Sequence, residues 1–164
     1  MAPLRLLLPI LLLAAGAARA QAPVPVAVFP FELADSSGEA AAGSHDARQA
    51  LATTELIRRL EQSGRYRSVD LAPLAAEVAA TAPRYDCGGC WLEVARKSGA
   101  QLAVLATVHK VSSLISTMDL WVADLRSGQY VAHVSGQIRG DTDTAWLRGV
   151  GFLVDERLLR QKLP

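Results

Sequence analysis

The sequence predicts a mixed α/β domain built on a five-stranded sheet. Two long apolar runs, 26–31 and 102–111, have strand length, and the first is continuous and without alternation, which is typical of parallel core strands buried on both faces. Later segments alternate apolar and polar residues with period two, which indicates a carboxyl-terminal antiparallel meander. Amphipathic stretches that end in glycine separate the early strands, as helices would. The expected order is β-α-β-α-α-β-β-β-α, packed as a two-layer or three-layer sandwich.

The first twenty residues are expected to be a signal peptide. Arg5 supplies a positive charge, 6–15 form an apolar segment, and Ala-Arg-Ala at 18–20 has the small-x-small pattern of a cleavage site. The apolar segment is shorter than the ~20 residues that a membrane span needs. We therefore expect cleavage after Ala20, a single mature domain over 21–164, and a periplasmic location without stable membrane insertion.

The charge balance argues against a nucleic-acid partner. The full chain has 17 basic and 16 acidic residues. Loss of Arg5 and Arg19 with the signal peptide would leave 15 basic residues against 16 acidic ones, a net charge of −1. Nucleic-acid-binding domains usually carry a basic excess or a basic stripe.

The first apolar run, 26–31, is predicted to be a strand at the centre of the sheet. Pro30 has no N–H to donate to a strand ladder, so it should lie at the end of this strand. Residues 32–43 are rich in Ala, Ser, Asp and Gly and are interpreted as a loop. Loops that follow such strands border the ligand crevices of α/β folds.

A long helix is predicted after this loop. Ser44 or Asp46 can cap its start, Leu51 lies on its apolar stripe, and Gly64 ends it. Two further elements complete this half of the chain, a short strand and an alanine-rich helix: 66–69 and 71–80.

The carboxyl-terminal half begins with a helix over 91–98 that Gly99 ends. The second apolar run, 102–111, follows as a strand. Three elements then complete the chain, two alternating strands and a last helix: 114–122, 130–138 and about 141–160. Gly149 and Gly151 lie inside this helix, where each costs ~1 kcal/mol relative to alanine.

Handedness and pattern together predict the strand neighbours. Right-handed crossovers place the first and third strands side by side at the centre of the sheet. The second strand then lies outside the first, and the two hairpin strands extend the opposite edge.

Cys87-Gly-Gly-Cys90 is the strongest candidate for chemistry. In an exported chain two cysteines this close are expected to form a disulfide, here a structural staple between a loop and the following helix. The alternative is a redox-active dithiol with Cys87 as the attacking sulfur and Cys90 as the resolving one, because N–H groups at a helix start stabilise a thiolate. The motif does not follow the first strand of a βαβ unit, which favours the structural role. Trp91 stands where haem attachment would need histidine.

A metal site is a weaker alternative for the same cysteines. Cys87 and Cys90 together with histidines would supply four ligands suited to zinc. His45, His109 and His133 are not at mutual ligand spacing, however. We therefore expect no metal and no cofactor.

Asp141 and Asp143 could form a carboxylate pair or part of a cation-binding loop. Capping of the last helix by Asp141 or Thr142 explains this stretch better. The sequence contains neither a G-x-S-x-G elbow nor a G-x-x-x-x-G-K-S/T loop. It therefore favours a protein without catalytic activity.

The three tryptophans, Trp91, Trp121 and Trp146, could form an exposed aromatic platform. The chain has only three tyrosines and three phenylalanines besides, so at least two of the tryptophans are expected in the core or at its edge.

Several motifs together resemble a known group of proteins. They are VAVFPFEL at 26–33, L-x-x-S-G-R-Y at 60–66, SVD at 68–70, ARKSGAQLAVLATV at 95–108 and D-x-x-S-G at 124–128. Over residues 26 to about 159 the chain resembles an uncharacterised family of small secreted bacterial proteins. More distantly it is similar to the TolB amino-terminal domain and to curli-secretion and flagellar outer-membrane-protein-like domains. The resemblance implies an envelope assembly or interaction module. Secretion-channel members are lipoproteins, whereas Gln21 stands here where a lipidated cysteine would.

We expect a non-enzymatic periplasmic accessory protein that binds another envelope or exported protein. Two surfaces are candidates, the loop 32–43 and the edge of the last hairpin, 130–138, which is open to β-augmentation. Two alternatives remain. One is a periplasmic thiol-disulfide oxidoreductase or redox-responsive protein that uses Cys87 and Cys90, and the other is a small-ligand binding module with its site above the central strands.

Overall fold

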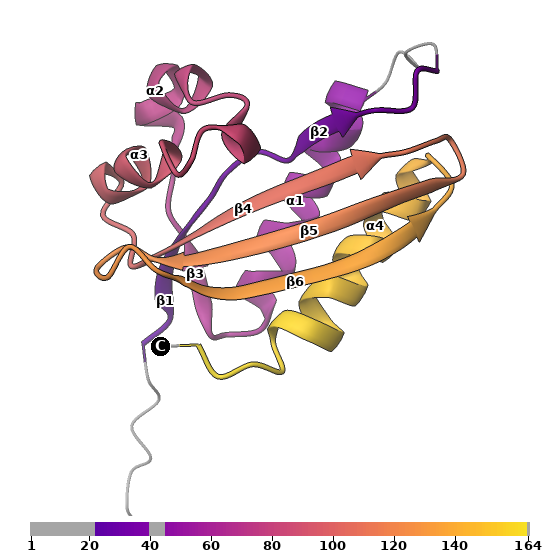
Figure 1. Cartoon of the computed structure of the whole chain (residues 1–164). Helices are drawn as coiled ribbons and strands as arrows, with labels where there is room; N and C mark the ends of the chain where they lie inside the picture. The colour runs from indigo at the N-terminus through magenta and orange to yellow at the C-terminus, as the bar shows by residue number, and fades with distance from the viewer. Residues whose placement is uncertain (1–21, 40–44, 164) are drawn as a thin grey trace, which may run out of the picture.

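The computed structural model describes residues 22–39 and 45–163. Within these ranges the chain forms one mixed six-stranded sheet with helices on both faces (Figure 1). The signal peptide expected over 1–20 and the expected cap at Ser44 lie outside the described residues. In the described part, no helix is both long enough and apolar enough to cross a bilayer.

The centre of the sheet is parallel and its far side is antiparallel. Strand β1 (Val24–Val28) pairs in parallel with β3 (Tyr66–Ser68) on one side and with β4 (Leu102–Lys110) on the other. Strands β5 (Ile115–Asp124) and β6 (Tyr130–Arg139) continue from β4 as an antiparallel meander. The order β3-β1-β4-β5-β6 confirms the predicted neighbours.

A sixth strand, β2 (Glu32–Asp35), lies where the sequence predicted a loop. It pairs in parallel with the second half of β4, so that β1 and β2 share one side of that strand. Pro30 separates them because it cannot donate to the ladder, whereas the Phe29 N–H still donates to the Val104 carbonyl (3.0 Å). The sequence predicted five strands, and the structure has six within the described residues. The proline interrupts the pairing of this segment with β4, but the pairing resumes after it as β2.

Helix α1 (His45–Gln62) covers one face of the sheet. Its buried apolar residues are spaced four apart, as a stripe facing a core requires: Ala52, Leu56 and Leu60. Leu51 was expected on this stripe, but it lies one position away and is 40% exposed. Gly64 follows the helix with φ of 68°, which confirms its predicted role as the terminating residue.

Helix α4 (Asp143–Gly151) and the π-helical segment η3 (Phe152–Leu158) cover the same face beside α1. The Thr142 side chain caps α4 by accepting a hydrogen bond from the Ala145 N–H (3.2 Å). Of the two predicted caps, Asp141 and Thr142, the structure therefore has Thr142. Gly149 allows the helix to approach β6, because a Cβ there would lie 2.5 Å from Ile138 Cγ2. The low helix propensity of this glycine is therefore offset by close packing.

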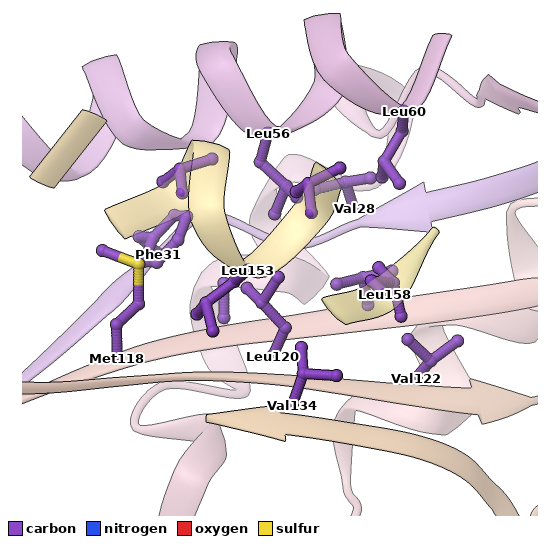
Figure 2. Packing of buried hydrophobic residues seen from close by; sticks show 14 of the residues in the cluster. Val28, Phe31, Leu56, Leu60, Met118, Leu120, Val122, Val134, Leu153 and Leu158 are labelled. Carbon is purple, nitrogen blue, oxygen red and sulfur yellow. The ribbon is translucent and has the colours of Figure 1, made fainter. Parts of the chain in front are cut away.

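The larger core fills the space between this face of the sheet and α1, α4 and η3 (Figure 2). Figure 2 shows the leucines of α1 and η3 pointing toward apolar side chains of β5 and β6: Leu56, Leu60, Leu153 and Leu158 against Met118, Leu120, Val122 and Val134.

A smaller core lies on the opposite face. It is covered by η1 (Ala72–Leu74), α2 (Ala75–Ala80), η2 (Arg84–Asp86) and α3 (Trp91–Lys97), which group at one end of the sheet (Figure 1). The helix predicted over 71–80 is thus split into a 3₁₀ turn and a short α-helix. The strand residues in this core come from β1, from the first half of β4 and from the end of β5: Ala27, Ala103, Leu105 and Ala123. No described helix covers the other half of this face.

We expect Gly149→Ala to lower the stability of the protein. Alanine gains ~1 kcal/mol of helix propensity, but forcing a methyl group against Ile138 costs about 1–3 kcal/mol. Urea unfolding should therefore give a lower free energy of unfolding for the variant. Gly151→Ala is the control, because its Cβ would meet only the guanidinium end of Arg59, which pairs with Glu55 and Asp155 but can shift more easily than Ile138, so this variant should be the more stable of the two. Equal stability of Gly149→Ala and Gly151→Ala would contradict this packing.

Candidate functional site

Cys87 and Cys90 form a disulfide directly before α3. Gly88 and Gly89 between them have φ of 64° and 97°, a conformation that residues with side chains rarely adopt. Cys87 is half-buried and packs against the smaller core, whereas Cys90 is exposed. The Cys90 N–H donates to Cys87 Sγ (3.2 Å). The disulfide therefore fixes a tight loop, 87–90, which we call the disulfide loop.

A buried ion pair between Arg84 and Glu32 joins the segment before this loop to β2. Arg84 Nη2 lies 2.8 Å from Glu32 Oε1, and the two side chains are 5% and 9% exposed. Glu32 Oε2 also accepts the Arg84 backbone N–H (2.8 Å), and Arg84 Nη1 donates to the Val78 carbonyl (2.9 Å). Burial lowers the pKa of the Arg84 guanidinium, and the attraction of Glu32 opposes that shift. Removing either partner would leave an uncompensated buried charge, so the pair fixes the position of the loop.

A groove of about 420 Å³ lies between the disulfide loop and the sheet. Its volume falls within the range of small-ligand sites. The lining residues come from three places, namely the η2 and disulfide-loop segment, strands β4 and β5, and the start of β6: Arg84, Tyr85, Gly88, Gly89, Leu105, Thr107, Asp119, Trp121 and Tyr130. The groove begins where the smaller core ends, because α2 and α3 cover only half of this face.

Aromatic rings form a row from the smaller core to the groove. The ring of Trp91 lies 6.3 Å from that of Tyr130, which lies 5.6 Å from that of Trp121. The His133 ring stacks on Trp121 at 3.5 Å and 6°, and its Nε2 lies 2.7 Å from Asp119 Oδ1. Trp91 is buried and Trp121 is half-buried at the groove.

The third tryptophan, Trp146, is buried in the larger core. Two of the three tryptophans are therefore core residues, as predicted.

A second polar site, the ionic cluster, lies where β2, β4, α1 and α4 meet. Its members are charged or titratable residues that pair with one another: Asp35, Glu39, His45, Arg48, Lys110, Asp141 and Asp143. The Lys110 ammonium is at its centre, 3.3 Å from Asp35 Oδ2 and 3.2 Å from Glu39 Oε2, and the side chain is 2% exposed. Asp141 bridges His45 Nε2 (2.7 Å) and Arg48 Nη1 (2.5 Å).

The pKa values in this cluster follow its pairing. Burial works against the charge of Lys110, but hydrogen bonds to Glu39 and Asp35 outweigh burial and raise its pKa. Burial raises the pKa of Asp141, but His45, Arg48 and Lys110 outweigh it and the net pKa is lowered. The cluster therefore stabilises the meeting point of four elements while its groups are charged.

The structure separates the residues that the sequence offered as metal ligands. His45 contacts Asp141, His109 contacts Ser36 Oγ (2.8 Å), and His133 contacts Asp119. Among the described residues, no group of three or more His, Cys, Asp or Glu side chains is arranged to hold a metal ion.

Thr142 caps α4, so of the two expected caps Asp141 was wrong, and the carboxylates of Asp141 and Asp143 pair with α1 instead. Asp141 accepts from Arg48 and His45, and Asp143 Oδ1 accepts from Arg48 Nε (2.9 Å). Their partners lie more than ninety positions earlier in the chain. Nothing local in the sequence around residue 141 could have indicated them.

The chain belongs to the family described as "Protein of unknown function (DUF2380)", whose model matches residues 24–158. This confirms the expected membership of an uncharacterised family. No curated protein matches the chain.

Several solved structures share the fold. The PelC dodecamer from Paraburkholderia phytofirmans is similar with a TM-score of 0.54 and 14% identity, over 88% of this chain and 93% of that one. Lipoprotein GNA1162 from Neisseria meningitidis is similar with a TM-score of 0.53 and 13% identity, over 85% of this chain and 100% of that one. The LpoB C-terminal domain from Salmonella enterica is similar with a TM-score of 0.50 and 16% identity, over 75% of this chain and 87% of that one. At these identities the likeness establishes the fold alone. The expected likeness to TolB is also found, at a TM-score of 0.47 that supports no further inference.

We expect the ionic cluster to make stability depend on acid pH. Hydrogen bonds from Ser37, together with Lys110, lower the pKa of Asp35 to about 2, and the pKa values of Glu39 and Asp141 are lowered as well. Carboxylates with lowered pKa stabilise the fold above their unfolded-state pKa of about 4 and lose that effect as pH falls toward 2. Urea titrations from pH 7 to pH 2 should show this decline.

Asp35→Asn should be less stable at pH 7 and should decline less steeply below about pH 4. The exposed Asp86→Asn, which lies outside the cluster, is the control. A decline of the same steepness in Asp35→Asn and the parent protein would show that this carboxylate is not part of the acid response.

Proposed function

We propose that the protein is a non-enzymatic accessory protein of the bacterial envelope, exported to the periplasm, that binds another exported protein. Three observations support the proposal. The first twenty residues have the pattern of a signal peptide, the fold is shared with a lipoprotein of Neisseria meningitidis, and one long strand has an open edge.

The open edge of β6 is the observation that carries the proposal. Strand β6 is the last of the sheet and pairs only with β5 within the described chain. Natural edge strands are often blocked by proline or lysine, and YVAHVSGQIR contains neither. An extended segment of a partner can therefore add to β6 through backbone hydrogen bonds, in the manner of β-augmentation.

The side chains beside this edge would set specificity. On the face of the sheet that α2 and α3 cover only in part, every second residue of β6 is polar and exposed: His133, Ser135 and Gln137. On the other face Phe152 is 44% exposed and lies beside Gly136, whose added Cβ would be 3.6 Å from the phenylalanine ring. A partner strand would therefore meet a polar row on one face and an apolar shelf on the other.

Position-specific photo-crosslinking tests this proposal. A photoreactive residue placed at Ser135 should give one discrete adduct with another exported protein when the full chain is expressed in the envelope. The same residue at Arg58, exposed on α1, should give none and serves as the matched control. Equal adducts at both positions would contradict a β6 site, and an adduct between two copies of this chain would identify self-assembly as the use of the edge.

A thiol-disulfide oxidoreductase is the second candidate, and one contact favours it. The Cys90 N–H that reaches Cys87 Sγ would stabilise a Cys87 thiolate after reduction. Cys90, however, is the more exposed of the two cysteines. We infer a structural role because Cys87 packs against the smaller core and the loop forms one wall of the groove.

The reduction potential separates these two roles. A structural disulfide should have a potential below about −300 mV and show no insulin-reductase activity, whereas a catalytic one is more oxidising. Replacing both cysteines by serine should lower the free energy of unfolding by about 2 kcal/mol, because the bond closes only a short loop. A potential well above −300 mV with ready thiol exchange would establish the oxidoreductase instead.

A further inference from the structure

The groove holds hydrogen-bond acceptors that the protein itself does not use. Asp119 gives one carboxylate oxygen, Oδ1, to His133, while Oδ2 has no partner within the described chain. The Thr107 hydroxyl lines the groove beside it and, among the described residues, has no hydrogen-bond partner either. The two residues face each other across β4 and β5 in the strand register. A ligand with two or more donors would therefore find neighbouring acceptors on the groove floor.

Aromatic rings surround these acceptors. Trp121 forms part of the floor, with His133 stacked over one side of its indole. Tyr85 and Tyr130 stand at the rim and are 47% and 50% exposed, so their rings are accessible to a ligand. Rings arranged around a site attract cations through their negatively charged faces.

The charge of the groove favours a cation. Asp119 and Arg84 are the charged residues that line it. Arg84 is buried and its charge is matched by Glu32 at 2.8 Å, so the pair contributes no net charge. Asp119 therefore gives the groove lining a net negative charge while its partner His133 is neutral.

We propose that this groove binds a guanidinium group, as carried by an arginine side chain or a small free guanidine. The guanidinium is planar and weakly hydrated, so it can lie against Trp121 and Tyr130 while its fork of N–H groups donates to Asp119 Oδ2 and Thr107 Oγ1. A lysine ammonium would pair with the carboxylate but has no flat face to stack. A neutral sugar would stack but would gain nothing from the charge of Asp119.

Calorimetric titration of the purified protein as it is exported tests the proposal. The probes are acetyl-Gly-Arg-Gly-amide, the same peptide with neutral citrulline in place of arginine, agmatine as a small guanidine that also carries an ammonium group, and chitobiose as a neutral sugar. The arginine peptide should bind at least roughly tenfold more tightly than the citrulline peptide, because the two differ only in charge and donors. Agmatine binding as tightly as the arginine peptide indicates a small free ligand, whereas tighter peptide binding indicates an arginine side chain.

Variants locate the binding in the groove. Asp119→Asn keeps the shape of the side chain and should weaken the arginine peptide by roughly tenfold or more. Asp86→Asn is the matched control, because it removes an exposed carboxylate close to Tyr85 that does not line the groove. Tyr85→Ala, at an exposed rim position that leaves the cores intact, should also weaken binding, and thermal melts verify that each variant is folded.

Three results would overturn the proposal. They are the absence of arginine-peptide and agmatine binding, equal binding of the citrulline peptide or of chitobiose, and equal weakening by Asp86→Asn and Asp119→Asn. These results test the groove with small probes and do not test the backbone edge of β6, although Ser135 lies opposite Asp119 in the strand register.

Discussion

The burial of strand β4 on both faces is the constraint on which the rest of the structure depends. Seven consecutive residues, from Leu102 to Val108, are buried. The even-numbered ones face α1, α4 and η3, and the odd-numbered ones face α2 and α3 or the groove. Three other strands pair with β4, namely β1 and β2 on one side and β5 on the other. Lys110 at the end of β4 is buried as well, and its ammonium group pairs with Asp35 and Glu39 of the ionic cluster.

The two faces of this strand are covered unequally, and the candidate sites follow from that difference. The larger core extends along β5 and β6 as far as Ile138, whereas the smaller core ends near Leu105. Beyond that point the sheet is lined by Thr107, Asp119 and Trp121, which border the groove. The disulfide loop and the buried pair of Arg84 and Glu32 hold the opposite wall in place. The groove is thus a consequence of short helices on one face, fixed by covalent and ionic contacts.

Much of this architecture could be predicted from local pattern. The run 26–31 and most of the run 102–111 are apolar on both faces, and that is why their central position and their pairing could be inferred. Period-two alternation identified β5 and β6, and glycines such as Gly64 marked the helix ends. The close spacing of Cys87 and Cys90 predicted their bond. In each case the information lies within one element.

The parts that could not be predicted depend on residues distant in the chain. Strand β2 has the sequence ELAD, which is too short and too polar to indicate a strand, and its Glu32 is buried only because Arg84 lies 52 positions later. Asp141 pairs with residues of α1. A glycine is needed at position 149 because Ile138 of β6 leaves no room for a Cβ there. The groove could not be anticipated because it requires both the register of β4 with β5 and the place where α3 ends.

Amide hydrogen exchange of the isolated protein, measured residue by residue, tests most directly whether the sheet is centred on β4 and open at β6. The amides of β4 should exchange only through global unfolding, since they lie between paired strands and two cores. Every second amide of β6 should exchange rapidly, because its outer N–H groups face solvent. Uniform protection along β6, or fast exchange within β4, would contradict the account.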